Sequence, residues 1–298
     1  MTDSRPPICD YEGSDYQTSF WELGGRQYED QAEGIALQRL LPTHGELLLE
    51  LGAGAGRNTP RYVGFKQMVL LDYSLSQLKQ AMQRLGRNQR YIYVAADIYK
   101  LPFVDGLFDT ATMIRTIHHM AEPQVALRQV WRTLQPGAIF ILEYANKQNL
   151  KSILRYYLGR QTWSPFSLKS VEFEKLNYDF HPKMVRSWLN ETGFTLESQL
   201  AVSYFRLGVF KRYFPLSLLT KLETWLQPTG NWCQLSPSVF TRNRVEGSTP
   251  KAQAGTFFKC PACESDTLKP HGARLICLGC SREWPIRQGI FDFRIDAN

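Results

Sequence analysis

The sequence predicts an α/β protein built on a doubly wound, mostly parallel, Rossmann-like sheet of seven strands. From residue 47 onward, short apolar runs alternate with stretches whose apolar residues recur at helical spacing, and a glycine-rich turn follows the first run directly. With 298 residues, the chain is long enough for about two domains. Its composition, 43% hydrophobic and 21% charged, excludes collagen-like, mucin-like and wholly disordered proteins.

Each element follows from a local pattern. Buried-strand patterns predict the first five strands at residues 47–51, 67–71, 91–95, 110–114 and 138–143. Helices are expected over 75–85 and 123–134, and Pro136-Gly137 supplies the turn before the fifth strand. A helix over 182–192 that stops at Gly193 precedes a sixth strand at 194–200, and residues 238–242 supply the seventh.

The chain divides into four parts. Residues 1–45 are expected to form an N-terminal helical lid, because residues 16–41 are helix-like and rich in aromatics. Residues 46–246 form the sheet domain, with helical cap insertions at about 146–180 and 203–236 near the carboxyl edge of the sheet, where open α/β sheets bind ligands. A polar linker at 247–255 leads to a cysteine-rich unit at 256–298.

The sequence carries no signal for export or for membrane insertion. No uninterrupted apolar run reaches the roughly 18 residues of a membrane span, and no basic head with an apolar run behind it occurs near the N-terminus. Four of the six cysteines form two CxxC pairs, which in a chain without export signals indicates metal binding rather than disulfides. We therefore expect a cytoplasmic protein with no transmembrane segment.

A nucleotide-type cofactor site is predicted at the carboxyl edge of the sheet. Gly52, Gly54 and Gly56 alternate after the first strand, where backbone without a Cβ can approach a ligand closely. Arg57 occupies the third glycine position of a dinucleotide fingerprint and argues against NAD or FAD. Asp72, twenty residues beyond Gly52, stands where a carboxylate can accept hydrogen bonds from ribose hydroxyls, and Asp97, after the third strand, can accept one from an adenine amine.

These stretches resemble the class I S-adenosylmethionine-dependent methyltransferases of type 11, in particular the branch with quinone-biosynthesis and wobble-uridine tRNA methyltransferases. The similarity covers roughly residues 45–145 and rests on 50–56, 71–74, 96–98, 101–103, 108–109, 117–119 and 134–137. It implies S-adenosylmethionine as cofactor, held by Glu50, Gly52, Ala53, Gly54, Gly56, Asp72, Tyr73, Asp97 and Ile98. Arg115 departs from the family pattern, and its guanidinium is expected to reach the methionine carboxylate or the acceptor, or else to form a salt bridge between loops.

Methyl transfer from a sulfonium needs alignment more than it needs catalytic groups. If the acceptor must lose a proton, His118 or His119 after the fourth strand could serve as the base, although paired histidines in such families often only shape the loop. Asp179 and His181 form a second candidate pair, for which a cap at the start of the helix beginning at Pro182 is the favoured interpretation.

The acceptor side of the chain is basic. Residues 146–250 hold 14 basic and 7 acidic side chains. Lys147, Lys151 and Arg155 recur every four residues beside leucines 150, 154 and 158, and cations alternate with aromatics at 204–206 and 210–214. This pattern favours RNA, a quinone-like or lipid-like acceptor, or peripheral contact with anionic lipid; core aromatics with solvated charges explain it as well. We expect no DNA partner. A non-catalytic, cofactor-binding scaffold that recruits a partner remains the alternative from another class.

The C-terminal cysteines predict a structural zinc ion. Cys260 and Cys263 are separated from Cys277 and Cys280 by thirteen residues, a spacing that places four thiolates on a tetrahedron in a zinc ribbon. With the stretch 283–290, the unit resembles the zinc-ribbon family related to the activator subunit of eukaryotic tRNA, rRNA and release-factor methyltransferases. The resemblance implies an activator fused in cis, with Trp284, Ile286, Ile290 and Phe291 packed on the catalytic domain. The sheet is expected to have a core of its own.

Overall fold

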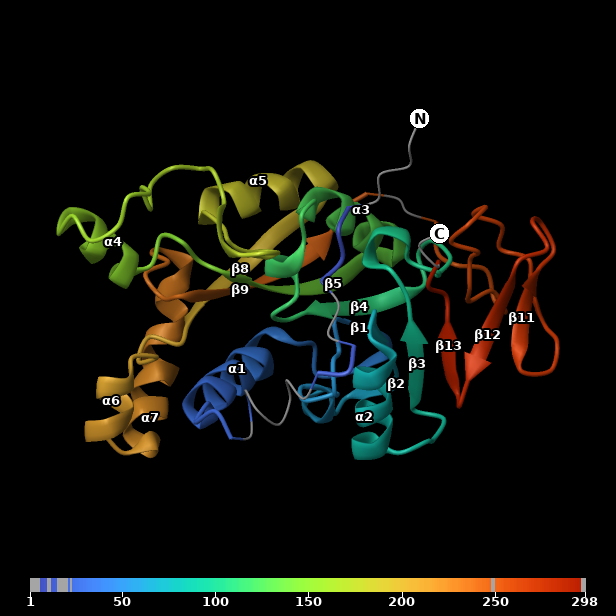
Figure 1. Ribbon diagram of the computed structural model, residues 1–298, viewed down its shortest axis with the longest axis horizontal. Coiled ribbons are helices and arrows are strands. Elements are labelled where there is room, and N and C mark those ends of the chain that lie inside the picture. Colours follow the sequence, from blue (N-terminus) through green and yellow to red (C-terminus); the bar gives the residue numbers. More distant parts are fainter. Residues whose placement is uncertain (1–5, 10–11, 15–20, 22, 248–249, 296–298) are drawn as a thin grey trace.

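The computed structural model describes residues 6–9, 12–14, 21, 23–247 and 250–295. Within these residues the main sheet has eleven strands in the order β10-β11-β12-β13-β3-β2-β1-β4-β5-β9-β8 (Figure 1). The expected count of seven is wrong because four strands of the C-terminal unit join the same sheet. The seven strands from β3 to β8 are those that the sequence pattern predicts for the α/β domain.

The order of the seven strands brings the carboxyl ends of five of them to one edge. Strands β1 (Gly45–Leu51), β2 (Phe65–Asp72), β3 (Tyr91–Ala95), β4 (Phe108–Met113) and β5 (Leu134–Ala145) are parallel. Strand β9 (Ser238–Val245) runs antiparallel to both β5 and β8 (Phe194–Val202). The sheet domain is therefore mostly parallel, as predicted.

Helices cover both faces of this sheet (Figure 1). On one face, α1 (Gln27–Leu40) and α2 (Leu75–Leu85) pack in one hydrophobic cluster. On the other, α3 (Pro123–Thr133) and α5 (Pro182–Thr192) pack in a second. Two of these helices begin or end at a capping residue. The Ser74 hydroxyl accepts a hydrogen bond from the Gln77 N–H at the start of α2, and Gly193, with φ 102°, ends α5 as expected.

The lid and the first cap insertion differ from the prediction. The described helix of the lid spans only α1, while residues 16–20 and 22 lie outside the described part. The insertion at 146–180 holds one short helix, α4 (Leu150–Tyr157), followed by a hairpin of β6 (Val171–Glu174) and β7 (Asn177–Asp179). The alternation of apolar and acidic residues in β6 suits a strand rather than a helix.

The second insertion is helical, as expected. It contains α6 (Gly208–Tyr213), α7 (Leu216–Leu226) and the 3₁₀ turn η5 (Gln227–Asn231). Further 3₁₀ turns are η2 (Thr59–Arg61), η3 (Ile98–Lys100) and η4 (Ile117–His119). Among the described helices, none combines the length and apolar character that a bilayer span requires.

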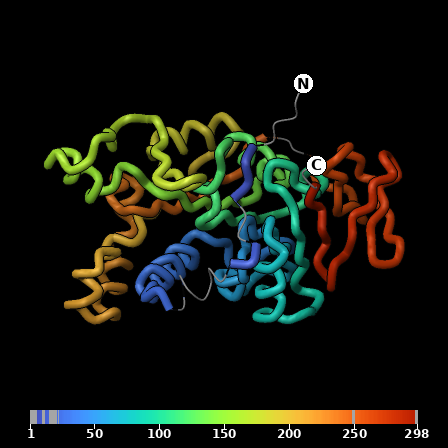
Figure 2. Tube along the Cα trace, viewed as in Figure 1, coloured from blue at the N-terminus to red at the C-terminus, as the bar shows by residue number. Residues whose placement is uncertain are grey.

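The C-terminal strands form a unit, called the ribbon below, that docks on the edge of the sheet domain (Figure 2). It comprises β10 (Leu268–Pro270), β11 (Arg274–Cys277), β12 (Glu283–Arg287) and β13 (Ile290–Asp292). Strand β13 pairs in parallel with β3, opposing Ile290 to Tyr93. Phe258 forms a bridge with Phe103, whose ring lies 6.0 Å away.

The ribbon and the sheet domain share one core. The cluster that contains Leu49 and Phe140 of the sheet also contains Cys260, Trp284 and Phe293 of the ribbon. The ribbon therefore adds its buried side chains to a core that is formed mostly by the sheet domain.

Candidate functional site

The glycine loop after β1 packs closely against Thr116 at Gly52 and has open space beside Gly54. Gly52 and Gly54 have φ of 66° and 52°, a region in which residues with a Cβ are strained. A Cβ on Gly52 would lie 2.2 Å from Oγ1 of Thr116, so only glycine fits there. A Cβ on Gly54 would find only Oε1 of Gln77, at 3.8 Å. The open side faces a cavity.

This cavity, of about 150 Å³, brings together eight of the ten predicted cofactor residues. They are Glu50, Gly52, Ala53, Gly54, Asp72, Tyr73, Ile98 and Arg115. The wall also includes side chains that the sequence did not single out: Trp21, Gln77, Tyr99, Thr116 and Met120.

Two predicted cofactor residues lie outside the cavity wall. A Cβ on Gly56 would meet Cδ1 of Leu85 at 2.9 Å and Cβ of Ala81 at 3.3 Å, so this glycine permits close packing against α2. Asp97 is buried, and its Oδ1 accepts a hydrogen bond of 2.8 Å from the Tyr99 N–H. Asp97 thereby caps η3 and fixes the turn that presents Ile98.

Asp72 fixes the glycine loop. Its Oδ2 accepts a hydrogen bond of 2.8 Å from the Gly54 N–H, and its Oδ1 accepts one of 2.9 Å from the Ser74 N–H. Asp72 therefore ties the end of β2 to the glycine loop at the wall of the cavity.

Glu50 is buried beneath the same loop. Its Oε2 accepts a hydrogen bond of 2.6 Å from the Thr59 hydroxyl, and its Oε1 accepts one of 3.3 Å from the Tyr62 hydroxyl. Burial raises the pKa of Glu50 to about 7, because these hydroxyls compensate only in part for lost hydration. A cationic group nearby would favour the ionised form.

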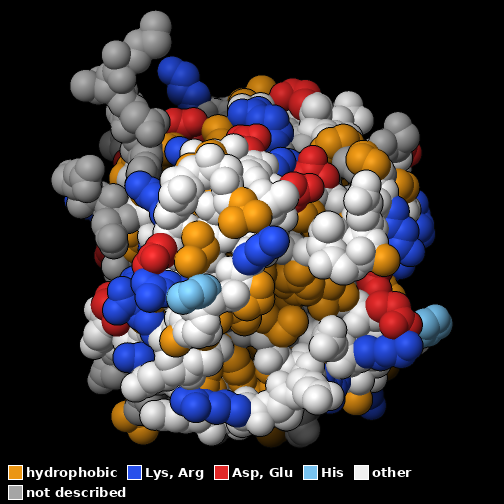
Figure 3. Space-filling model, turned by 90° about the vertical axis from the view of Figure 1, so that its right-hand side faces the viewer, with side chains coloured by type: hydrophobic (Ala, Val, Ile, Leu, Met, Phe, Trp, Pro, Cys, Tyr) orange, Lys and Arg blue, Asp and Glu red, His pale blue; other side chains and the backbone are white. Residues whose placement is uncertain are grey.

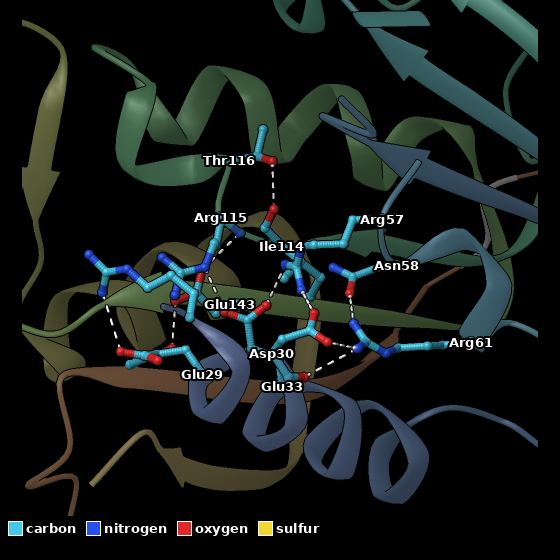
Figure 4. A network of polar contacts seen from close by, with 12 residues as sticks. Glu29, Asp30, Glu33, Arg57, Asn58, Arg61, Ile114, Arg115, Thr116 and Glu143 are labelled. Carbon is cyan, nitrogen blue, oxygen red and sulfur yellow. Dashed lines mark hydrogen bonds and ion pairs between the residues drawn. The ribbon is translucent and has the colours of Figure 1, made fainter. Parts of the chain in front are cut away.

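An ion-pair network joins the cavity wall to α1 (Figure 4). Glu33 is 1% exposed and accepts hydrogen bonds from Arg57, at 2.5 Å, and from Arg115, at 2.6 Å. Burial alone would raise the pKa of Glu33, but the two guanidiniums outweigh it and hold the pKa below its usual value. Asp30 pairs with Arg57 and Arg61. Arg115 thus forms a salt bridge that joins the loop after β4 to α1, and it also lines the cavity.

Two further contacts fix Arg115. Its backbone N–H donates to Oε2 of Glu143 at 2.8 Å. The Trp21 ring lies 4.8 Å from the Arg115 guanidinium and 3.5 Å from that of Arg57. A sequence signal for this network exists: Glu33 is an acid at a buried position of a helix whose other buried residues are mostly apolar, such as Ala36.

The two candidate bases after β4 differ in their surroundings. His118 is half-buried; its Nδ1 is buried and has no hydrogen-bond partner in the described structure, and desolvation lowers the pKa of His118 well below the usual value. His119 lines the cavity, and its Nδ1 lies 2.9 Å from the Leu176 carbonyl oxygen. Burial lowers the pKa of His119 too, so both rings are neutral at pH 7.

The second candidate pair and the basic helix face are only partly as expected. His181 caps α5, with its Nδ1 accepting the Lys183 N–H at 3.2 Å. Burial raises the pKa of Asp179 to about 6.

Lys147 does not share an exposed face with Lys151 and Arg155. It precedes α4 and is buried, with its ammonium donating to the Ser167 and Lys169 carbonyls.

Four cysteine sulfurs converge in the ribbon. Those of Cys260, Cys263, Cys277 and Cys280 all lie within 4.8 Å of one another. The distance from Cys260 to Cys280 is 3.8 Å, and that from Cys263 to Cys277 is 3.5 Å. Zinc–sulfur bonds of about 2.3 Å in a tetrahedron require sulfurs about 3.8 Å apart, so the donor set fits this ion.

The ribbon also touches the wall of the cavity. The Arg294 guanidinium lies 5.7 Å from the ring of Tyr73, and both its Nε and its NH2 donate to Asp292 at the end of β13. The cavity and the cysteine cluster are therefore connected through one short segment.

Comparison with known proteins identifies the central region. Residues 49–142 match the methyltransferase domain family. A demethylmenaquinone methyltransferase of Clavibacter sepedonicus is 28% identical over 179 residues, 59% of this chain and 72% of the relative. A ubiquinone/menaquinone biosynthesis C-methyltransferase of Pseudomonas savastanoi is 28% identical over 54% of this chain and 65% of its own length. An O-methyltransferase of Penicillium expansum is 29% identical over 45% and 52%. The last two matches thus span between half and two thirds of the relatives.

Solved structures share the fold. A complex between the Haloferax volcanii Trm112 methyltransferase activator and a methyltransferase matches with a TM-score of 0.54, at 15% identity, over 78% of this chain and 96% of the matched chain. A methyltransferase of Thermotoga maritima matches with a TM-score of 0.51, at 21% identity, over 77% and 95%. The family match and the relatives show an S-adenosylmethionine-dependent methyltransferase domain in this chain, and the solved structures show that its fold is shared.

Proposed function

We propose that the chain transfers the methyl group of S-adenosylmethionine to a quinone-like, lipid-soluble acceptor. Support comes from the relatives: two of the three described above are named as methyltransferases of quinone biosynthesis. The family match at residues 49–142 includes most of the residues that line the cavity.

The residues of the cavity suit this cofactor, which supplies a methyl group on a sulfonium when bound. The backbone of Gly52, Ala53 and Gly54 offers close approach, because the space where a Cβ of Gly54 would point is open. Asp72 offers a carboxylate at the cavity wall to ribose hydroxyls, Ile98 and Tyr73 offer apolar and aromatic walls, and Glu50 offers a carboxylate to a cationic amine. In this proposal Arg115, Asp97 and Gly56 position the loops.

His119 is the better placed of the two candidate bases. A carbonyl oxygen only accepts hydrogen bonds, so the contact with Leu176 requires the proton of the neutral ring to be on Nδ1. Nε2 is then the ring atom that can take a proton from a hydroxyl or an acidic carbon of the acceptor. His118 does not line the cavity and packs against the His119 ring, with centroids 4.2 Å apart, which suits a supporting role.

We further propose that Cys260, Cys263, Cys277 and Cys280 hold one structural zinc ion and that the ribbon acts as a stabilising activator in cis. Four thiolates complete a tetrahedral site and leave no open position for catalysis. One of the solved structures with the same fold is a complex with a methyltransferase activator, and here a ribbon of the same chain covers an edge of the sheet.

The acceptor is tested by incubating the full chain with cofactor labelled in the methyl group and with fractionated cell extract. We expect label in the organic-soluble fraction and none with an Asp72→Ala variant. Label in RNA or protein instead would overturn the quinone-like acceptor. Binding of cofactor without label in any fraction would favour the scaffold alternative.

Replacing Asp72 with alanine should weaken binding of S-adenosylhomocysteine by about ten- to a hundredfold, because a charged hydrogen bond contributes about 1.5–3 kcal/mol. Asp72→Asn is the matched variant. Its amide oxygen keeps one acceptor, so its affinity for S-adenosylhomocysteine should lie between those of the parent chain and of Asp72→Ala. Calorimetry measures both, with thermal unfolding as the control for the fold. Unchanged affinity in Asp72→Ala would contradict the assignment.

A further inference from the structure

The end of the molecule opposite to the ribbon has an unusually apolar surface. Two segments, residues 150–170 and 205–233, contain α4, α6 and α7 and form what we call the cap end (Figures 1 and 2). Of the eighteen large hydrophobic side chains that are exposed in the described residues, fourteen belong to it. They are Leu150, Leu154, Tyr156, Tyr157, Leu158, Phe166, Leu168, Leu207, Val209, Tyr213, Phe214, Leu218, Trp225 and Trp232.

The helices of the cap end leave much of their surface without a partner. Within α4 only Ser152 is buried, and α6 buries no residue. The rings of Tyr156, Tyr157 and Phe166 contact one another, with centroids about 6 Å apart, although Tyr157 is 73% exposed. A monomer gains nothing by exposing such a cluster, so an exposed apolar surface of this kind marks an interaction site.

The charge of the cap end has one sign. Its two segments contain eight cations, Lys151, Arg155, Arg160, Lys169, Arg206, Lys211, Arg212 and Lys221, and a single acid. That acid, Glu223, is buried and accepts hydrogen bonds from Tyr28 and Ser203. On the face at the ribbon end, by contrast, Lys, Arg, Asp and Glu side chains are interspersed (Figure 3). Within these two segments, apolar side chains and cations therefore lie together without exposed acids, although Lys211 is paired with the buried Glu29 and the adjoining β6 carries the exposed Glu172 and Glu174.

We infer that the cap end docks on the surface of an anionic lipid bilayer. Leucine, tyrosine and tryptophan side chains enter the boundary between headgroups and acyl chains, while lysine and arginine reach the lipid phosphates. A second copy of this chain fits poorly, because pairing two cap ends would bring like charges together. RNA fits less well, because half of the fourteen exposed side chains are leucine or valine, which do not stack on bases.

Docking goes beyond the methyl transfer proposed above and is independent of it. A lipid-soluble acceptor would be drawn from the same bilayer. Binding to vesicles requires neither cofactor nor turnover, so failure of docking and failure of the proposed reaction give separate results.

The test is co-sedimentation of the full chain with vesicles of phosphatidylcholine, with and without phosphatidylglycerol. We expect binding to the anionic vesicles only, weakened about fivefold for each cation removed in Lys151→Gln and Arg155→Gln. The double variant Leu154→Glu with Tyr157→Glu should lose at least tenfold. Val63→Glu is the matched control, since Val63 is 76% exposed outside the cap end, and it should bind as the parent does.

Three results would overturn the inference. One is absence of binding to anionic vesicles, and another is an equal loss in Val63→Glu. The third is that the cap-end substitutions abolish RNA binding or self-association while vesicle binding is unchanged. Thermal unfolding and cofactor affinity should be the same in all variants, because the substituted side chains are exposed. These two measurements are the control that each variant is folded.

Discussion

Replacing Gly54 with valine should abolish binding of S-adenosylmethionine and leave the chain folded. The residue has φ 52°, and a Cβ there would point into the cavity beside Gln77. A branched side chain would therefore occupy ligand space and strain the loop by roughly 1–2 kcal/mol, far less than the stability of a domain. Calorimetry with the cofactor measures the loss, and the thermal transition shows whether the fold survives.

Gly137→Val is the control that separates two effects of Gly54→Val, the loss of ligand space and the strain of a positive φ. Gly137 has φ 76° and nothing within 4 Å of a built Cβ, but it does not line the cavity. This variant should carry similar strain and bind the cofactor normally. If it also lost binding, strain rather than space would explain Gly54→Val. A missing thermal transition in Gly54→Val would show that the glycine is needed for folding.

Loss of the metal should destabilise the whole chain, not only the ribbon. The cysteine cluster holds the hairpins that carry β13, and zinc binding in small units is worth on the order of 10 kcal/mol of folding free energy. Cys260 and Cys277 belong to the same core as strands of the sheet domain. Cys277→Ser, or treatment with a chelator, should therefore remove zinc and lower the melting temperature of a single transition.

Cys233→Ser is the matched control, because Cys233 is an exposed cysteine outside the cluster. It should keep one zinc ion per chain and the parent melting temperature. Metal analysis that finds no zinc in protein purified without chelator would refute the site, as would stoichiometric zinc in Cys277→Ser. An unchanged melting temperature in metal-free protein would contradict the prediction that the ribbon and the sheet domain unfold together.

Local patterns were sufficient for most of the sheet domain. The apolar run ending in Gly52 predicts a buried strand and a ligand loop, and Gly193 marks the end of α5, because these signals depend on residues close in sequence. Apolar and acidic residues also alternate in β6, as they do in a strand, but the insertion around it was expected to be helical.

Long-range pairing could not be predicted in the same way. The partner of Arg115 is Glu33, 82 residues away, and no spacing rule connects a loop after β4 with α1. The docking of β13 on β3 was equally hidden, because Ile290 could have served a core within the ribbon alone. Asp97 follows a strand as an adenine-binding acid would, yet only the structure shows its carboxylate capping η3.

The pairing of β13 with β3 has a consequence for the order of folding during synthesis. Strand β3 is made early, but the strand that closes its edge follows every other strand of the sheet along the chain. Until β13 has paired, the edge of β3 presents unpaired backbone groups and Phe103 lacks its bridge to Phe258, and such an edge is a template for association with other chains. If the proposed zinc ion orders the ribbon, the supply of zinc would decide how long that aggregation-prone stage lasts.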